Sequence, residues 1–338
     1  KPQDGRIRTA RGEGEMDLRV STLPTAFGDK LVIRVLDPSV LVRDLADLGF
    51  LSGEREEIER WLARPHGLVV VTGPTGSGKT TTLYSALQAL ASPEVNVVTI
   101  EDPIEMVHES FNQIQADAKT GTSFVEALRH VLRQDPDVIM VGEIRDHETA
   151  QTAVEASLTG HLVLSTLHTN SAPETVTRLL DMGMDPFNFA DSLLAVLAQR
   201  LVRRLCSECR SSRPASEEEI DELLADYLNG FGDEATPALR EATLRGWIER
   251  FGRDGRLQHF HAPGCTHCGN TGFRGRAGVH ELMVVSRAMR RLIQTGSRAE
   301  ALQETALREG MRTLRQDGIE KVWQGVTAID EVRAISNL

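Results

Sequence analysis

The fold is decided by one stretch of the sequence, Leu68-Val-Val-Val-Thr-Gly-Pro-Thr-Gly-Ser-Gly-Lys-Thr80. It begins as an apolar, β-branched run, continues as Gly73-x4-Gly78-Lys79-Thr80, and leads into a helix-like segment. A glycine-rich loop between a strand and a helix is the setting of a phosphate-binding loop. Its backbone N–H groups and the positive end of the helix surround an anion. The sequence therefore predicts a site for a nucleoside triphosphate with Mg²⁺.

Specific contacts to the nucleotide follow from the chemistry of this loop. Lys79 is expected to reach the β- and γ-phosphates as a point charge, and Thr80 to give its hydroxyl to Mg²⁺. A chance match in a glycine-rich loop is the alternative, and the flanking strand and helix argue against it. The predicted binding loop consists of Gly73, Pro74, Thr75, Gly76, Ser77, Gly78, Lys79, Thr80 and Thr81.

The composition is that of a soluble globular protein with about two or three domains. The 338 residues are 40% hydrophobic and 26% charged, and the net charge of −11 argues against a wide nucleic-acid-binding face. No apolar run approaches the ~18 residues that cross a bilayer, and we see no signal peptide. We therefore expect a cytoplasmic protein that reaches a membrane only through a partner. Because the chain opens on Lys1 without an initiator methionine, we expect a fragment of a longer protein.

The beginning of the chain has the alternation of β-strands. Residues 16–20 and 30–35 alternate with a period of two, and glycines separate them. Residues 1–37 are therefore predicted as strand, turn and strand, the end of a β-rich domain. Residues 38–51 are expected to form a linker.

From residue 52 the pattern becomes α/β. A first helix is expected to about Ala63, and short apolar runs then alternate with helices. Such runs are typical of a parallel sheet that is buried on both faces. The α/β core is predicted to span residues 52–205. Its predicted strands are 68–72, 96–100, 137–141 and 161–166, and its later helices are 123–133, 172–182 and 187–205.

All four cysteines belong to C-x-x-C pairs: Cys206, Cys209, Cys265 and Cys268. In a cytosolic chain two such pairs indicate a tetrathiolate zinc site more readily than disulfides. Four thiolates leave no open coordination position, so this zinc would be structural. Two independent reduced dithiols are the alternative, because the connecting segment 210–264 is long. A histidine could also replace a thiolate, the candidates being His259, His261 and His267.

The C-terminal half is predicted to hold two further regions. Residues 206–279 would form the metal-binding subdomain, in which 214–257 is charged and helical, with a capping box at Ser216. Residues 280–338 are predicted as several short helices.

Carboxylates follow two of the predicted strands. Glu101, Asp102 and Glu105 come after the second strand, and Glu143 ends the third. In an open α/β sheet the ligand lies beyond the carboxyl ends of the strands, so these groups are placed for metal or water chemistry. For the first three, an acidic cluster at a helix N-terminus is the alternative. Glu143 occupies the position of an acid that organises Mg²⁺, although Asp is commoner there.

The fourth predicted strand ends in a polar tail, Ser165-Thr-Leu-His-Thr-Asn170. His168 in this tail could sense the γ-phosphate, and a purely structural role is the alternative. Phosphoryl transfer also needs cations that compensate charge on the γ-phosphate oxygens. The candidate arginines, for which surface solvation is the alternative, are Arg19, Arg34, Arg129, Arg133 and Arg145.

Together these motifs resemble the secretion-type ATPase superfamily, in particular type II secretion ATPases and type IV pilus-assembly ATPases. They are the phosphate loop, the acidic box 101–105, Gly142-Glu-Ile-Arg-Asp146, and Gly160-His161 with the polar tail. They occur in the family's order, and the resemblance covers nearly the whole chain. It implies a RecA-like α/β domain after a PAS-like domain, of which residues 1–37 would be the end, and a homo-hexamer.

For the nucleotide and the metal, the resemblance implies three contacts. Lys79 and Thr80 would contact ATP and Mg²⁺. Glu143 would organise the Mg²⁺-bound water.

For catalysis, the resemblance implies a second set of residues. Glu105 is similar in position to the family's catalytic glutamate, which orients or activates the attacking water, and Glu101 and Asp102 match the same box. His168 matches the family's histidine. The resemblance also implies two arginines that reach the nucleotide across a domain or subunit boundary: Arg19 and Arg34.

The implied function is Mg²⁺-dependent ATP hydrolysis between the subunits of a ring motor. The C-x-x-C pairs resemble those of secretion and pilus-assembly members, and the choice between these two stays open. The implied partners are an inner-membrane platform protein and a cytoplasmic docking protein, with no nucleic acid and only indirect membrane contact. The alternatives are a nucleotide-gated, zinc-stabilised scaffold without significant hydrolysis, and a nucleic-acid motor.

Overall fold

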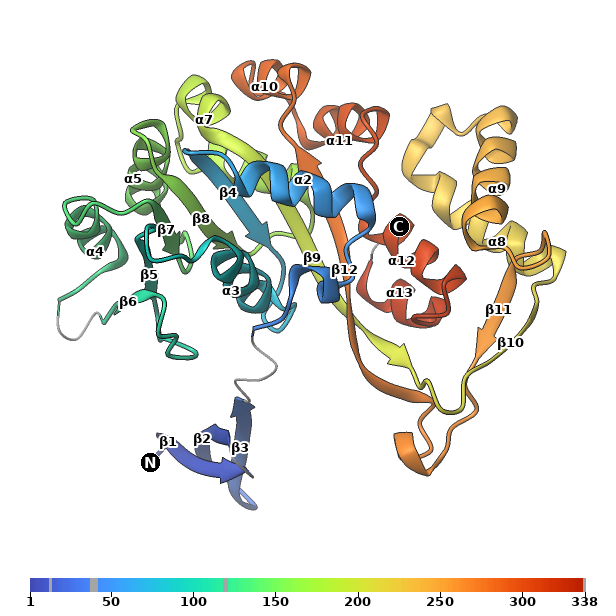
Figure 1. Cartoon of the computed structure of the whole chain (residues 1–338), viewed down its shortest axis with the longest axis horizontal. Coiled ribbons are helices and arrows are strands. Elements are labelled where there is room, and N and C mark those ends of the chain that lie inside the picture. The colour runs from blue at the N-terminus through green and yellow to red at the C-terminus, as the bar shows by residue number, and fades with distance from the viewer. Residues whose placement is uncertain (12–13, 37–41, 118–120, 337–338) are drawn as a thin grey trace.

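The computed structural model describes residues 1–11, 14–36, 42–117 and 121–336. Part of the expected linker, residues 38–41, lies outside the described residues. Figure 1 shows a central sheet with helices around it, a small sheet below it, and a helical region with the C-terminus to one side. Within the described ranges, no helix is both long and apolar enough to cross a bilayer.

A seven-stranded sheet forms the centre of the molecule. β12 is antiparallel to β9, and the other neighbouring pairs are parallel. The predicted α/β class with a mostly parallel sheet is confirmed, and all four predicted strands are present. In spatial order the strands are β12 (Phe273–Val284), β9 (Leu193–Leu205), β4 (Gly67–Thr72), β8 (Leu162–Leu167), β7 (Val138–Val141), β5 (Val97–Glu101) and β6 (Asn112–Gln115).

Helices cover both faces of this sheet. Successive side chains of a strand point to opposite faces, so Leu68 and Val70 of β4 join one apolar cluster, and Val69 and Val71 join the other. The first cluster includes side chains of α4 (Phe124–Val131), α5 (His147–Leu158), α6 (Ala172–Asp181), α7 (Pro186–Ser192), α10 (Arg287–Gln294) and α11 (Ala299–Arg308). The second includes side chains of α2 (Ser52–Leu62), α3 (Lys79–Leu90) and the short helix η1 (Leu45–Leu48).

The predicted helix 187–205 is wrong. Helix α7 ends at Ser192, and Leu193–Leu205 is the strand β9, which lies between β4 and β12. Seven of the eight residues 193–200 are buried, because both faces of the sheet are covered. When a strand is buried on both faces, its sequence lacks the alternation of apolar and polar residues that would distinguish it from a helix.

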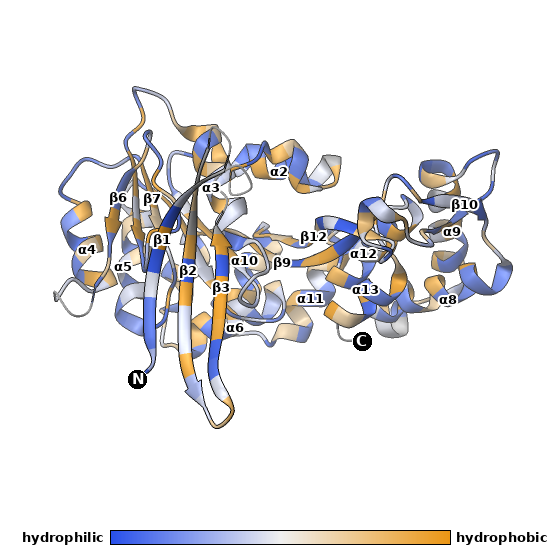
Figure 2. Cartoon of the chain, turned by 90° about the horizontal axis from the view of Figure 1, so that it is seen from below, coloured by the Kyte–Doolittle hydropathy of each residue, from blue (hydrophilic) through white to orange (hydrophobic). Residues whose placement is uncertain are grey.

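The N-terminal segment forms a three-stranded antiparallel sheet of β1 (Gln3–Arg11), β2 (Gly14–Thr25) and β3 (Gly28–Leu36). Strand, turn and strand were predicted there, so the first strand was missed. β1 is rich in charged and small residues, and Ile7 is its single large apolar side chain, which hides the alternation. Figure 2 shows apolar residues along β2 and β3, and several of them, including Leu31 and Ile33, are largely exposed.

The C-terminal half contains the predicted helices. α8 (Glu217–Leu228) begins with the predicted capping box at Ser216, and α9 (Pro237–Phe251) follows the short helix η2 (Asn229–Glu234). The remaining elements are β10 (Ser211–Pro214), β11 (Gln258–His261), η3 (Thr266–Cys268), α12 (Leu314–Trp323) and α13 (Ile329–Ile335). α8, α9 and α12 share an apolar cluster around Trp247 and Trp323. The predicted boundary between the metal-binding subdomain and the C-terminal region, at residues 279 and 280, lies inside β12. This strand joins the cysteine-containing region to the central sheet.

Candidate nucleotide-binding site

The phosphate loop connects β4 to α3, as predicted from the sequence. Two of its glycines are required for two reasons: a side chain would collide with neighbouring atoms, and the backbone has a positive φ angle. A Cβ on Gly73, where φ is 151°, would lie 2.5 Å from the Gln199 carbonyl oxygen and 2.6 Å from Ser77 Oγ. A Cβ on Gly78, where φ is 89°, would lie 2.7 Å from Gln199 Nε2. The loop therefore packs directly on β9, and only glycine fits at these two positions.

Lys79, the first residue of α3, folds back over the loop. Its Nζ donates to the carbonyl oxygens of Gly73 at 2.7 Å and Pro74 at 3.0 Å. Burial lowers the pKa of Lys79 to about 8, and the carboxylate of Glu143 partly opposes this effect. A bound phosphate would favour the charged ammonium. Thr80 and Thr81 lie half-buried in the first turn of the same helix.

Two residues of β9 that the sequence did not single out lie behind the loop, and one of them holds it by hydrogen bonds. The buried Gln199 of β9 donates from Nε2 to Ser77 O at 2.8 Å and accepts from Thr82 Oγ1 at 2.6 Å. Arg200, also buried, donates from Nη2 to Asn170 O at 3.1 Å. Their positions beside the loop were missed because residues 187–205 were predicted as a helix rather than as a strand of the central sheet. Their one signal was a pair of polar residues, Gln199 and Arg200, inside an otherwise apolar run.

The carboxyl ends of three strands meet beside the loop. Glu143, after β7, forms an ion pair with Arg145, whose Nη1 lies 3.7 Å from Asp102 Oδ2 after β5. His168, after β8, lies between Glu143 and the loop. Its Nε2 is 3.9 Å from Glu143 Oε2, and its Nδ1 is 3.1 Å from Gly73 O. Because a carbonyl oxygen only accepts, this last hydrogen bond requires a proton on Nδ1.

Glu105 meets the N-terminal sheet. Arg19 Nη2 on β2 lies 3.1 Å from Glu105 Oε2, and Nη1 donates to Oε1 at 3.4 Å. Arg34 on β3 is paired with Arg19 in the β2–β3 ladder, and its side chain is exposed. The structure thus brings Arg19 and Glu105 together.

The sequence predicted that Glu101 contacts the nucleotide, but in the structure its side chain lies inside the protein. Its side chain is buried and accepts hydrogen bonds from Tyr84 Oη at 2.5 Å, Thr99 Oγ1 at 2.6 Å and Gln113 Nε2 at 3.1 Å. Three donors therefore surround this carboxylate inside the protein, whereas Asp102 is exposed and faces Arg145.

A cavity of about 380 Å³ adjoins the phosphate loop. Gly78 and Thr81 form one wall, Phe50 and its neighbours before α2 form another, and Arg276 on β12 contributes a third. The cavity thus continues from the loop along the edge of the sheet.

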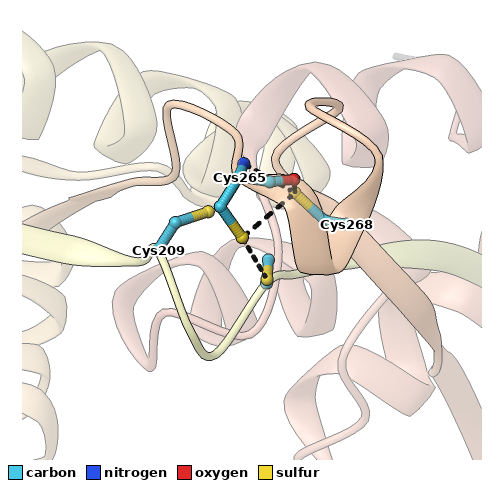
Figure 3. Close-up of side chains that lie close together, drawn as sticks. Cys209, Cys265 and Cys268 are labelled. Atoms are coloured by element: carbon cyan, nitrogen blue, oxygen red, sulfur yellow. Dashed lines mark hydrogen bonds between the residues drawn. The ribbon is translucent and has the colours of Figure 1, made fainter.

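The four cysteines gather at one point, although the two pairs are far apart in the sequence. Figure 3 labels three of them, Cys209, Cys265 and Cys268. All four are free thiols, and their sulfur atoms lie within 4.8 Å of one another. Cys265 Sγ is 3.9 Å from Cys206 Sγ and 3.8 Å from Cys268 Sγ. Tetrahedral Zn–S bonds of about 2.3 Å place the sulfurs about 3.8 Å apart. The observed spacing fits one tetrathiolate site better than two independent dithiols.

Backbone N–H groups favour a thiolate at Cys268, whereas burial raises the pKa of Cys209. Cys268 Sγ accepts from the N–H groups of Cys265 at 3.2 Å and Gly272 at 3.3 Å. Burial alone would raise the pKa of Cys268, but these hydrogen bonds lower it to about 6. His259, an alternative ligand in the sequence, instead pairs with Glu219 at 2.9 Å.

A phosphate loop on a mostly parallel sheet, with carboxylates at the strand ends, defines an α/β protein of the phosphate-loop class. Residues 1–334 match the Type II/IV secretion system protein family, and the chain belongs to that family. This confirms the resemblance that the motifs carry.

Individual relatives agree with this membership. The chain is 46% identical over 336 residues to the type IV pilus assembly ATPase TfpB of Acinetobacter baylyi, covering 98% of this chain and 53% of that protein. It is 44% identical over 335 residues to the type II secretion system ATPase E of Vibrio cholerae, covering 99% and 61%. The solved pilus retraction motor PilT with bound ADP has a TM-score of 0.64 and 27% identity, covering 100% of this chain and 78% of that one. The chain thus spans just over half the length of these two curated relatives.

Proposed function

We propose that this chain is the ATP-hydrolysing core of a ring motor that energises type II protein secretion or type IV pilus assembly. The observation that carries the proposal is the convergence of Lys79, Glu143 and His168 on the phosphate loop. The Arg19–Glu105 pair adds the catalytic carboxylate and a cation. Relatives at 44% and 46% identity that are named ATPases support the same activity.

Each of these residues has a separate role in the proposed phosphoryl transfer. The N–H groups of the loop hold the phosphates, Lys79 neutralises the β- and γ-phosphates, and Thr80 with Glu143 would hold Mg²⁺. Bound Mg²⁺ would supply charge neutralisation during phosphoryl transfer. Glu105 orients the attacking water. Arg19 exchanges its present carboxylate partner for the oxygens of the γ-phosphate, and Arg34, on the neighbouring strand, adds a second cation.

The rest of the ligand has a place beside the loop. The cavity of about 380 Å³ begins at Gly78 and Thr81 and is large enough for a nucleoside. We therefore place the ribose and the base there, between Phe50 and Arg276. Asp102, which faces Arg145, completes the acidic side of the site.

A structural zinc ion in the cysteine cluster is part of the proposal. The sulfur spacing and the N–H groups that favour a Cys268 thiolate support it. Such a site would hold together segments that are distant in the chain, and it would leave no open position for catalysis.

The domain organisation that we propose follows the sequence. Residues 1–37 are the end of a PAS-like domain, 38–51 a linker, 52–205 a RecA-like core, 206–279 the zinc subdomain and 280–338 the helical C-terminal region. The antiparallel sheet at residues 3–36 supports the first assignment, and the mostly parallel sheet supports the third. β12 ties the last two regions to the core.

The assembly and location rest on family membership. We propose a homo-hexamer in the cytoplasm that is peripheral to the inner membrane. It would reach the membrane through an inner-membrane platform protein and a cytoplasmic docking protein.

The proposal is tested by ATP turnover per chain, measured against protein concentration, with Lys79→Ala as the blank. A specific activity that rises with concentration indicates sites completed by a neighbouring subunit. Glu105→Gln should retain ATP binding and lose turnover by about 100-fold or more. Glu109→Gln, an exposed carboxylate of the same loop, is the matched control and should leave turnover within about twofold of the parent, far from a general-base effect.

One outcome would remove the role of a residue, and two others would favour a different function. Turnover of Glu105→Gln within severalfold of the parent would remove the catalytic role from that residue. Tight ATP binding without turnover at any concentration would favour the scaffold alternative, and stimulation of turnover by DNA would favour a nucleic-acid motor.

A further inference from the structure

The segment between β5 and β6 carries Glu105 and is fastened just behind it. The carbonyl oxygen of Met106, the next residue, accepts from Gln113 Nε2 at 2.9 Å and lies 3.3 Å from Tyr84 Oη. Gln113 Oε1 in turn accepts from the backbone N–H of His108 at 2.7 Å. One side-chain amide therefore holds the backbone at two points shortly after Glu105.

A buried hydrogen-bond network orients this amide. Gln113 Nε2 also donates to Glu101 Oε1 at 3.1 Å and lies 3.2 Å from Tyr84 Oη. The Tyr84 hydroxyl has a single proton, and its 2.5 Å contact with Glu101 is much shorter than its 3.3 Å contact with Met106 O. Tyr84 thus fixes the Glu101 carboxylate, and Glu101 fixes Gln113.

The network also joins the two catalytic elements of the proposed site. Tyr84 lies in α3, the helix that begins with Lys79 at the end of the phosphate loop. Its ring is fully buried and meets Phe111 edge-on at 5.8 Å. Burial and the neighbouring Glu101 carboxylate raise the pKa of Tyr84, so its hydroxyl stays a donor.

We propose that Tyr84, Glu101 and Gln113 are positioning residues that place the Glu105 carboxylate relative to the phosphate loop. The inference rests on the proposed function, because Glu105 is the group through which they act. It gives Glu101 a role other than contact with the nucleotide. Since its side chain is enclosed by three donors, it acts through the backbone of the next segment.

The test compares Tyr84→Phe and Gln113→Met with the parent chain. Both substitutions keep the bulk of the side chain and remove the polar groups. We expect kcat to fall about tenfold, or 1.4 kcal/mol, while KM for ATP changes by less than about twofold. A purely structural defect would instead lower the amount of active protein and leave the kcat of the active fraction unchanged.

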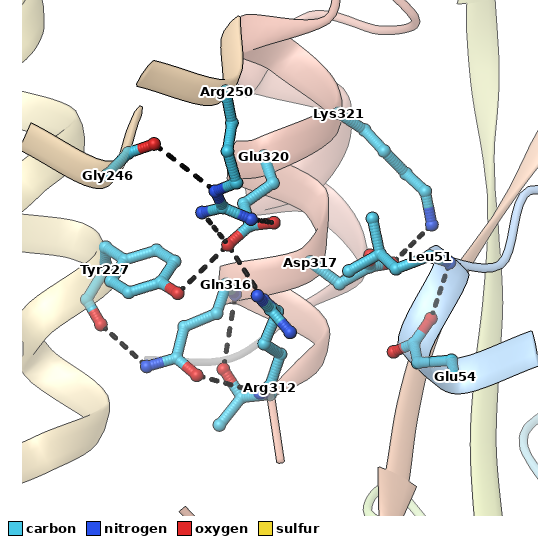
Figure 4. A network of polar contacts seen from close by, with 11 residues as sticks. Leu51, Glu54, Tyr227, Gly246, Arg250, Arg312, Gln316, Asp317, Glu320 and Lys321 are labelled. Atoms are coloured by element: carbon cyan, nitrogen blue, oxygen red, sulfur yellow. Dashed lines mark hydrogen bonds and ion pairs between the residues drawn. The ribbon is translucent and has the colours of Figure 1, made fainter. Parts of the chain in front are cut away.

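Tyr227→Phe is a matched control. Tyr227 Oη donates to Glu320 Oε1 at 3.1 Å in a separate buried network, where Arg250 and Arg312 also pair with Glu320 (Figure 4). It thus removes another buried tyrosine–glutamate hydrogen bond, outside the proposed active site. We expect its kcat to stay within about twofold of the parent, well short of the tenfold, or 1.4 kcal/mol, loss at Tyr84.

A double variant separates this inference from the proposed function. If Tyr84 acts through Glu105, Tyr84→Phe should cause no further loss in a Glu105→Gln background, so the two effects are not additive. A further tenfold loss there, or a kcat of Tyr84→Phe within about twofold of the parent, would overturn the inference alone. An active Glu105→Gln chain would overturn the catalytic role of Glu105 and this inference with it.

Amide hydrogen exchange gives an independent readout of the same contact. The His108 N–H should exchange faster in Gln113→Met, because its acceptor is removed, and should be unchanged in Tyr227→Phe. Equal exchange in the parent chain and in Gln113→Met would show that Gln113 does not hold this segment, and would reject the inference.

Discussion

Replacing Gln199 by Met should weaken both the fold and the nucleotide site. Met has nearly the same length and bulk, but it can neither donate to Ser77 O nor accept from Thr82 Oγ1. Both contacts are short, at 2.8 Å and 2.6 Å, and Gln199 is buried. The substitution therefore leaves two polar groups of the phosphate loop and α3 without these partners.

The expected magnitude follows from these two groups. A buried carbonyl that loses its donor costs about 1–3 kcal/mol. The Thr82 hydroxyl can turn to a backbone carbonyl one helical turn back, so its loss adds only about 0.5–1 kcal/mol. We expect the free energy of unfolding to fall by about 1.5–4 kcal/mol. ATP affinity should fall about three- to tenfold, because the loop is no longer held in its binding conformation.

Urea unfolding followed by circular dichroism measures the first effect, and titration with a fluorescent ATP analogue measures the second. Gln316→Met is the matched control, since Gln316 is also buried and makes one donor and one acceptor bond, to Tyr227 O and from Thr313 N–H at 3.0 Å each. It should lower stability without changing ATP affinity. A loss in Gln199→Met below about 0.5 kcal/mol, with unchanged affinity, would refute the reasoning, since 0.5 kcal/mol is the bottom of the range for one hydrogen bond.

Other parts of the structure make further predictions. Burial raises the pKa of Glu281 from 4.5 to about 7, so the folded state retains a proton that the unfolded state releases. The contribution of Glu281 to stability should therefore fall as pH rises from 4.5 to about 7 and then level off, and a melting temperature whose slope over this range is the same in Glu281→Gln as in the parent would contradict the assignment. The cysteine cluster should bind about one zinc per chain by elemental analysis. Cys265→Ser should lose the metal and melt earlier, and full zinc content in this variant would argue against the site. Gly73→Ala should abolish ATP binding in calorimetric titration, because its Cβ would lie 2.5 Å from Gln199 O. Binding close to that of the parent would show that the loop can shift.

Much of the candidate site could be predicted because its signals are local. A phosphate loop needs its glycines, lysine and threonine in consecutive positions, and a strand-end carboxylate such as Glu143 directly follows an apolar run. The C-x-x-C pairs are local as well, and their union at one point was predicted from the lack of other cysteines. For each of these features, a few adjacent residues contain the physical requirement.

Other features depend on which segments become neighbours. β9 could not be distinguished from a helix, because burial on both faces removes the periodicity of its sequence. Gln199 gains its role only because β9 lies beside β4 and under the phosphate loop. The first strand of the N-terminal sheet was missed because partner strands, rather than its own apolar residues, define it.

The sequence by itself predicted a phosphate-binding loop between a strand and a helix, four strands of the mostly parallel sheet and a four-cysteine cluster. The tertiary structure decided the partners of the charged side chains. Glu101 and Asp102 are adjacent and chemically alike, yet one is buried among Tyr84, Thr99 and Gln113, and the other faces Arg145. The reason is physical: successive residues at a strand end point in opposite directions, and only the packed neighbours decide what each side chain meets.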